Sequence, residues 1–114
     1  MEISQAAGAL GALAQESRLR IFRLLVQSGP EGMAAGDIAR KLKLPHNTLS
    51  FHVSILSRAG LVTSRKEGRS VLYAVDLEGT RALLGFLVED CCRGHPEICG
   101  TLTRADSLEP CSSS

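Results

Sequence analysis

Two short runs of β-forming residues, joined by a basic connection, constrain the fold of this chain more than any other feature. Residues 61–65 and 71–75 are rich in Val, Leu and Thr, and residues 66–70 between them contain a glycine and two basic side chains. Runs this short and this close together pair as an antiparallel hairpin. The sequence therefore predicts a β-hairpin with a positively charged tip.

Helical patterns surround the predicted hairpin. We expect helices at 3–14, 17–27, 34–42, 46–58 and 78–92. Ser17 is the expected N-cap of the second helix, and Pro45 and Gly60 mark the limits of the fourth. Leu49, Val53 and Leu56 recur at helical spacing and are expected to point inward. The predicted fold class is mainly α with a β-hairpin.

The charge of the chain is concentrated in its middle. The whole chain of 114 residues has a net charge of only +1, but residues 36–73 carry seven basic and two acidic groups, a local charge of +5. Residues 74–114 carry three basic and seven acidic groups, a local charge of −4. This distribution favours a surface that faces phosphates on the middle segment alone.

Several function classes are disfavoured by the sequence. No apolar run approaches the roughly 20 residues that span a bilayer, and the first residues lack the pattern of a signal peptide. We therefore expect a cytoplasmic protein without a membrane partner, in which thiols stay reduced. No phosphate-binding loop, dinucleotide fingerprint or nucleophile–base pair is recognisable, so the chain is not expected to be an enzyme.

Two short helices followed by a basic hairpin are typical of a winged helix-turn-helix. In that arrangement the second of the two helices enters the major groove of DNA, and the hairpin reaches a flanking groove or the backbone. Polar side chains at the start of the 46–58 helix suit base edges, and basic side chains of the hairpin suit phosphates. The residues expected to contact double-stranded DNA are His46, Asn47, Thr48, Ser50, His52, Arg65, Lys66 and Arg69. Phe51 is expected to pack against its own domain, with an apolar contact to a thymine methyl group as the alternative.

Two segments resemble a known family. The run Leu-Ser-Phe-His-Val-Ser-Ile-Leu-Ser-Arg-Ala-Gly-Leu-Val at 49–62, the hairpin that continues to Tyr73, and the run Glu-Ser-Arg-Leu-Arg-Ile-Phe-Arg-Leu-Leu at 16–25 resemble the ArsR/SmtB family of transcriptional repressors. The resemblance implies a homodimer held by the first and last helices. It also implies binding to an operator with an imperfect inverted repeat, and release of that operator when a ligand arrives.

Three cysteines near the C-terminus form the expected ligand site. Cys91, Cys92 and Cys99 lie within nine residues, and Gly94 and Pro96 allow the chain to fold back between them. Three thiolates suit a soft ion. The cluster is similar to a family variant that binds trivalent arsenic at the end of the last helix, which implies As(III) or Sb(III) as the inducer. Residues 1–92 are then the DNA-binding and dimerisation domain, and residues 93–114 are a sensor loop and flexible tail.

Other roles for these cysteines stay open. His95 adds a nitrogen, so a Cys₃His site for Zn(II) or Cd(II) is an alternative. A thiol redox switch that pairs Cys99 or Cys111 with one of the adjacent cysteines is another. Buried thiols without a ligand are the third. Two other ligand sites of the family are not expected here. The arsenic site on the first helix of the helix-turn-helix needs cysteines, and none precedes residue 91. The zinc-type site on the last helix needs histidines, and none lies within 78–90.

Overall fold

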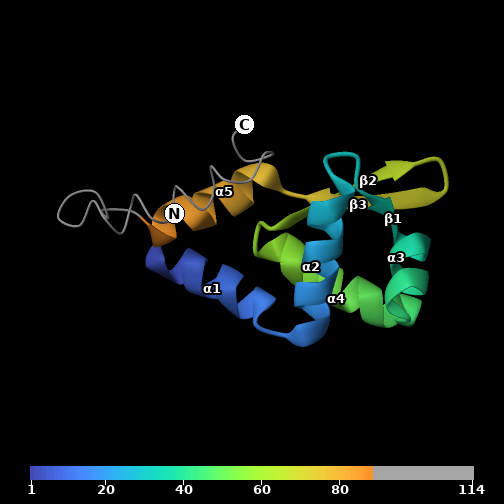
Figure 1. The fold of residues 1–114 in the computed structure, drawn as a ribbon, viewed down its shortest axis with the longest axis horizontal. Helices are drawn as coiled ribbons and strands as arrows, with labels where there is room; N and C mark the ends of the chain where they lie inside the picture. Colours follow the sequence, from blue (N-terminus) through green and yellow to red (C-terminus); the bar gives the residue numbers. More distant parts are fainter. Residues whose placement is uncertain (89–114) are drawn as a thin grey trace. The chain divides into compact units, whose positions relative to one another are not determined.

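The computed structural model describes residues 1–88 of the chain (Figure 1). Residues Met1–Leu83 form one compact unit, and a second unit begins at Leu84 within the last helix. The elements in chain order are α1 (Ile3–Leu13), α2 (Glu16–Ser28), β1 (Met33–Ala34), α3 (Ala35–Leu42), α4 (His46–Arg58), β2 (Val62–Glu67), β3 (Ser70–Val75) and α5 (Leu77–Leu87). The predicted class, mainly helical with a hairpin, is confirmed.

The first helix buries only small side chains. Ala6, Ala9 and Ala12 lie on one face of α1 at helical spacing and are at most 5% exposed. Larger apolar residues of α1, including Ile3 and Leu10, stay exposed. Alanines allow helix backbones to approach closely, so α1 packs near α2 and α4 and keeps its larger side chains outside.

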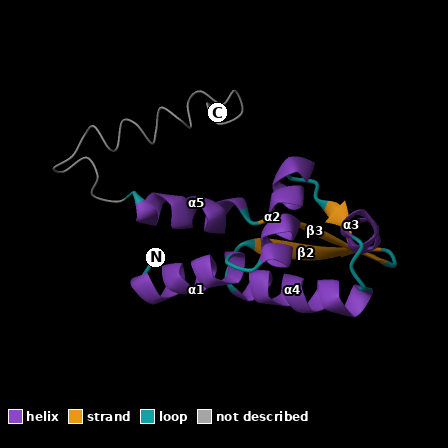
Figure 2. Ribbon diagram, turned by 60° about the horizontal axis from the view of Figure 1, so that its bottom comes forward, coloured by secondary structure: helices purple, strands orange, loops and turns teal. Residues whose placement is uncertain are grey.

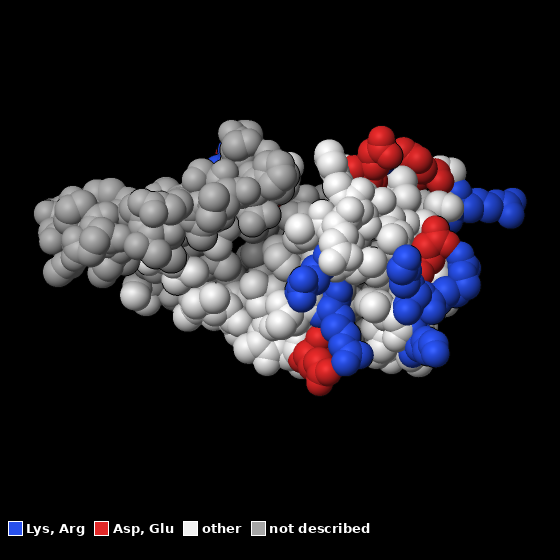
Figure 3. Space-filling model, viewed as in Figure 1, with Lys and Arg blue, Asp and Glu red and all other residues white. Residues whose placement is uncertain are grey.

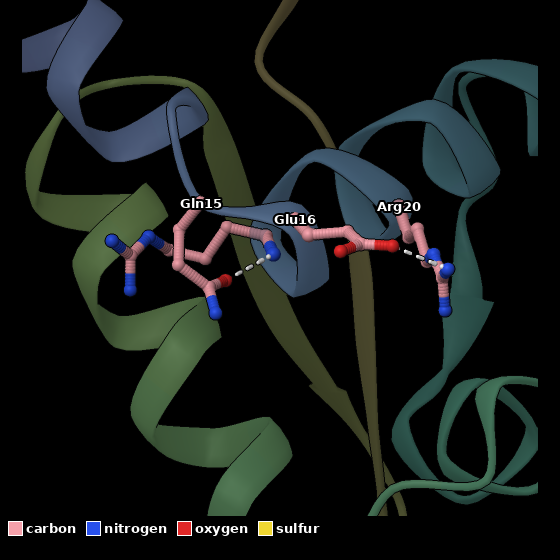
Figure 4. Close-up of polar contacts among 4 residues, drawn as sticks. Gln15, Glu16 and Arg20 are labelled. Carbon is pink, nitrogen blue, oxygen red and sulfur yellow. Dashed lines mark hydrogen bonds and ion pairs between the residues drawn. The ribbon is translucent and has the colours of Figure 1, made fainter.

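The start of α2 differs from the prediction. Gln15, and not Ser17, is the N-cap, and its Oε1 accepts a hydrogen bond from Arg18 N at 2.9 Å (Figure 4). Glu16 then opens the helix and pairs with Arg20 one turn later, with 2.6 Å between Oε2 and Nη2. The sequence predicted Ser17 because serine is a common N-cap before an apolar run. In the structure the Gln15 amide fills this role two residues earlier, so the prediction was wrong.

Helices α3 and α4 form a helix-turn-helix with a tight connection. Lys43 closes α3 in the left-handed conformation, at φ 58°, and Pro45 precedes the first residue of α4. Leu49, Val53 and Leu56 are buried, as predicted, and lie in one core with Ile21, Leu25 and Ile38. This core fixes α4 against α2 and α3 and leaves the opposite face of α4 in solvent.

The hairpin is longer than predicted and belongs to a three-stranded sheet. Strands β2 and β3 pair from Val62–Val75 to Glu67–Ser70, so only two residues form the turn (Figure 2). A two-residue strand, β1, pairs with β3 on its other side and makes β3 the central strand. Gly32 permits this approach, because a β-carbon there would lie 2.2 Å from Tyr73 O.

The last helix begins against the end of α4. A β-carbon on Gly79 would lie 1.8 Å from Gly60 O, so the two backbones meet where only glycine fits. Asp76 caps α5 through Oδ1, which accepts from Gly79 N at 3.0 Å, and its own N–H donates to Leu61 O at 2.9 Å. The helix ends at Leu87; the predicted continuation over 89–92 and the domain boundary after residue 92 lie outside the described residues. None of the helices in 1–88 has the length and apolar character to cross a bilayer.

Candidate nucleic-acid interface

The solvent face of α4 is polar along the first half of the helix. His46, Asn47 and Ser50 are exposed, and Thr48 is half-buried. Asn47 Oδ1 accepts from Thr48 N at 3.0 Å, which satisfies one of the free N–H groups at the start of the helix. Four of the residues expected to contact DNA thus share one end of one helix.

His52 does not lie with them. Its side chain is only 8% exposed, and its Nδ1 is 3.2 Å from Arg18 Nη1. Burial, with the nearby Arg18 charge as a second cause, lowers the pKa of His52 below 6.5. The expectation that His52 faces DNA is therefore corrected, because position 52 lies on the side of α4 that faces the core.

Phe51 was also assigned to the wrong face. Its side chain is 60% exposed, and its ring forms an edge-type pair with the neighbouring His52 ring, with centroids 5.5 Å apart and planes at 61°. About 100° per residue separates side chains around a helix. With Leu49 and Val53 facing inward, that spacing places position 51 outside and position 52 near the core. Helical spacing alone would therefore have predicted an exposed Phe51 and a buried His52, whereas the residue types suggested the reverse.

The three basic residues of the hairpin differ in how they are held. Arg65 Nε lies 3.3 Å from Glu67 Oε2, and its Nη2 donates to Glu31 O at 3.5 Å. Lys66 and Arg69 are exposed and form no ion pair with another residue in 1–88. Figure 3 shows Lys and Arg side chains gathered on the side of the molecule that carries α3 and the hairpin tip. Lys66 and Arg69 are therefore the hairpin cations with the greatest freedom to meet a phosphate.

A pocket of about 340 Å³ brings the hairpin and α4 together. Arg69 of the hairpin turn lines it together with His46 and Ser50 of α4, so residues about 20 positions apart in sequence meet at one concave surface. The start of α3 and Tyr73 complete its wall. Sequence reasoning missed the α3 contribution, because it depends on the pairing of β1 with β3, for which two residues give no pattern.

The predicted ligand cysteines, Cys91, Cys92 and Cys99, lie outside the described residues, as do His95 and Cys111. Residues 1–88 contain no cluster of three or more His, Cys, Asp or Glu side chains placed to hold a metal ion.

Comparison with known proteins identifies the family. A helix-turn-helix domain model matches residues 13–65. The chain is 31% identical over 86 residues to the transcriptional activator HlyU of Vibrio cholerae, an alignment that covers 75% of this chain and 77% of that protein. It is 35% identical over 79 residues to the putative arsenical resistance operon repressor ArsR of Halobacterium salinarum, covering 69% of this chain and 60% of the relative.

A solved structure supports the same assignment. The homodimeric winged helix-turn-helix DNA-binding domain of a possible ArsR-family regulator from Mycobacterium bovis matches with a TM-score of 0.63 and 30% identity, over 82% of this chain and 85% of that one. These relatives are transcription regulators and not enzymes, as predicted. The helix-turn-helix, the wing and these similarities show that the chain belongs to the ArsR/SmtB family of winged helix-turn-helix transcription regulators.

Proposed function

We propose that the chain is a homodimeric, cytoplasmic repressor that binds an operator with an imperfect inverted repeat and leaves it when As(III) or Sb(III) binds its cysteine cluster. The observation that carries the DNA-binding part is the pocket shared by α4 and the hairpin. There Arg69, His46 and Ser50 offer a cation, an imidazole and a hydroxyl to one surface. Such a surface suits a groove edge, where phosphates and base edges lie within a few ångströms of each other.

The contacts of this interface divide by chemistry. His46, Asn47, Thr48 and Ser50 would meet base edges from the first turns of α4, and Asn pairs well with adenine in the major groove. Arg65, Lys66 and Arg69 would neutralise phosphates from the hairpin. The base contacts provide specificity and the phosphate contacts provide affinity. His52 takes no part, because it is buried.

A dimer is supported by the apolar side chains that the helices leave in solvent. Ile3 and Leu10 of α1 are 74% and 42% exposed, and Leu77 of α5 is 59% exposed. A monomer gains nothing from such exposure, whereas a partner helix buries it. The Mycobacterium bovis relative is described as homodimeric. Two copies related by a two-fold axis present two α4 helices to the two halves of an inverted repeat.

The proposed inducer follows from the chemistry of three thiols. Thiolates are soft donors, and trivalent arsenic or antimony accepts three of them without needing a fourth ligand. Cys91, Cys92 and Cys99 would supply these donors. A relative named for an arsenical resistance operon supports this choice. For the DNA-bound population to shift from about 99% to about 1%, the inducer must favour the released form by about 5.5 kcal/mol.

The test begins with a duplex that the wild-type protein selects from a randomised library, called here the selected duplex. Fluorescence anisotropy then follows its release during titration with As(III), Sb(III), Zn(II) or Cd(II). We expect release by As(III) or Sb(III) for the wild type and for the control Cys111→Ser, and none for Cys92→Ser. Release by Zn(II) or Cd(II) alone would favour the Cys₃His alternative with His95. Release by oxidant alone would favour a redox switch, and failure to select any duplex would refute DNA binding.

A further inference from the structure

An exposed aromatic ring stands in the middle of the polar face of α4. Phe51 is 60% exposed and lies next to Ser50 and one helical turn from Asn47 and Ser54. The exposure of Phe51 does not reflect loose packing of α4, because Leu49 and Val53 on the opposite side are at most 3% exposed. The helix therefore presents a large apolar surface at the place where the other side chains are polar.

The Phe51 ring is also held in position. It meets the edge of the His52 ring at 5.5 Å, and His52 is in turn fixed by Arg18 through the 3.2 Å contact between Nδ1 and Nη1. Aromatic rings favour such an edge-to-face arrangement, so it favours this orientation of the Phe51 ring. A side chain with a preferred orientation loses less conformational entropy when a ligand contacts it.

We propose that Phe51 reads a thymine in the operator by packing against its 5-methyl group. This inference rests on the proposed DNA binding and specifies one base that the interface recognises. In the major groove, thymine is the base that presents a methyl group, and an apolar side chain is its natural partner. Asn47 and Ser50, which lie beside the ring on its N-terminal side, take the hydrogen bonds of neighbouring base pairs. The three side chains thus divide the readout between polar and apolar contacts.

Deoxyuridine provides a direct test, because it differs from thymidine only by this methyl group. Each thymine of one half-site in the selected duplex is replaced in turn by deoxyuridine, and the affinity is measured by anisotropy. We expect one position at which the wild type loses about fourfold in affinity, the value of one buried methyl group. Phe51→Ala should bind the thymine and deoxyuridine duplexes equally.

A matched control separates this contact from a general effect of apolar exposure. Val26 on α2 is 54% exposed, and Val26→Ala should keep the full discrimination between thymine and deoxyuridine. Phe51→Leu should keep part of it, since leucine also offers an apolar surface. The exposure of Phe51 predicts that all these variants fold, which circular dichroism and sedimentation of the dimer would verify.

Three results would overturn the inference. The first is a wild type that binds every deoxyuridine duplex as tightly as the thymine duplex, which leaves the proposed DNA binding intact. The second is a loss of affinity at the same position that is equally large in Phe51→Ala. The third is the absence of any selected duplex, which would refute the proposed function together with this inference.

Discussion

Arg18 joins α1 to the buried imidazole of His52. Its Nε donates to Ala12 O at 2.7 Å while its Nη1 lies 3.2 Å from His52 Nδ1. Because an arginine side chain has only donors, Nδ1 of His52 must accept, and the imidazole proton must therefore reside on Nε2. One guanidinium thus connects the end of the first helix to the helix proposed to read DNA.

The stability of the protein should depend on pH through His52. Its pKa is lowered in the folded protein, first by burial and then by Arg18, from the ordinary value of 6.5. The unfolded chain therefore binds more protons just below pH 6.5, so the stabilising contribution is complete above 6.5 and is lost as the pH falls toward the folded pKa. Urea unfolding between pH 7.5 and 5.5 should show this decline, and His52→Gln should flatten it. An unchanged slope in His52→Gln would assign the decline to other groups.

Arg18→Ala should destabilise the protein by about 1–3 kcal/mol. The substitution leaves Ala12 O and His52 Nδ1 without a donor in a partly buried place. Arg20→Ala is the matched control, since Arg20 is an exposed arginine on the same helix and its pairing with Glu16 lies in solvent, where such pairs contribute little. Chemical denaturation of both variants at pH 7.5 measures the difference. Equal effects would show that the Arg18 contacts are energetically unimportant.

Gly79→Ala should destabilise the protein by about 1–3 kcal/mol or more. The new methyl group would meet Gly60 O, which is backbone and has no rotamer to change, so α5 or the end of α4 must move. Gly36→Ala serves as the comparison, because the nearest atom to its added β-carbon is Arg40 Nη1 at 3.7 Å, the end of a flexible side chain. Thermal unfolding should show a large fall for Gly79→Ala and no fall for Gly36→Ala. A stable Gly79→Ala would mean that α5 adjusts at little cost.

Asp76→Ala should cost about 1 kcal/mol, the usual effect of losing an N-cap acceptor. Asp76 Oδ1 is the acceptor for Gly79 N at the first turn of α5. Asp76→Asn keeps an oxygen at that place and should retain most of the stability. Urea unfolding of the two variants separates the hydrogen bond from the charge, since loss in both would assign the effect to the carboxylate charge.

Lys66→Ala and Arg69→Ala should each weaken binding to the selected duplex and lower the salt dependence of affinity. A phosphate contact contributes about 0.9 to the slope of log K against log salt concentration, so each variant should reduce that slope by about 1. Arg23→Ala, which removes an exposed cation of α2, should leave the slope unchanged. Anisotropy titrations at several salt concentrations measure this. Slopes equal to that of the wild type would remove the hairpin from the interface.

The parts of the fold with strong local patterns were predictable from the sequence. Helix α4 begins after Pro45, whose ring fixes φ, and ends before Gly60, which adopts a φ of 81° that other residues avoid. Its bounds match the prediction of 46–58. The pairing of β2 with β3 followed from two β-rich runs with a short connection. In contrast, β1 is a strand only because Met33 and Ala34 meet Tyr73 and Leu72, and a two-residue segment has no periodicity of its own.

The candidate site was predictable in location but not in orientation. The polar start of α4 and the basic hairpin were expected and lie at one pocket. The assignments of Phe51 and His52 failed because residue type was given more weight than helical spacing. His52 is buried because Arg18 supplies a hydrogen-bond donor to it. Arg18 lies on another helix, 34 positions away in sequence. Such long-range pairing cannot be inferred from the local pattern.

The position of β2 at the border of the sheet has a consequence for solubility. Its outer backbone groups have no neighbouring strand in residues 1–88, which makes β2 a place where another chain could add itself and begin an aggregate. Arg65, Lys66 and Glu67 crowd this border with charges of both signs. The cations proposed to bind DNA phosphates thus also disfavour the addition of another strand to this edge. A variant with apolar residues in place of both Arg65 and Lys66 should aggregate more readily.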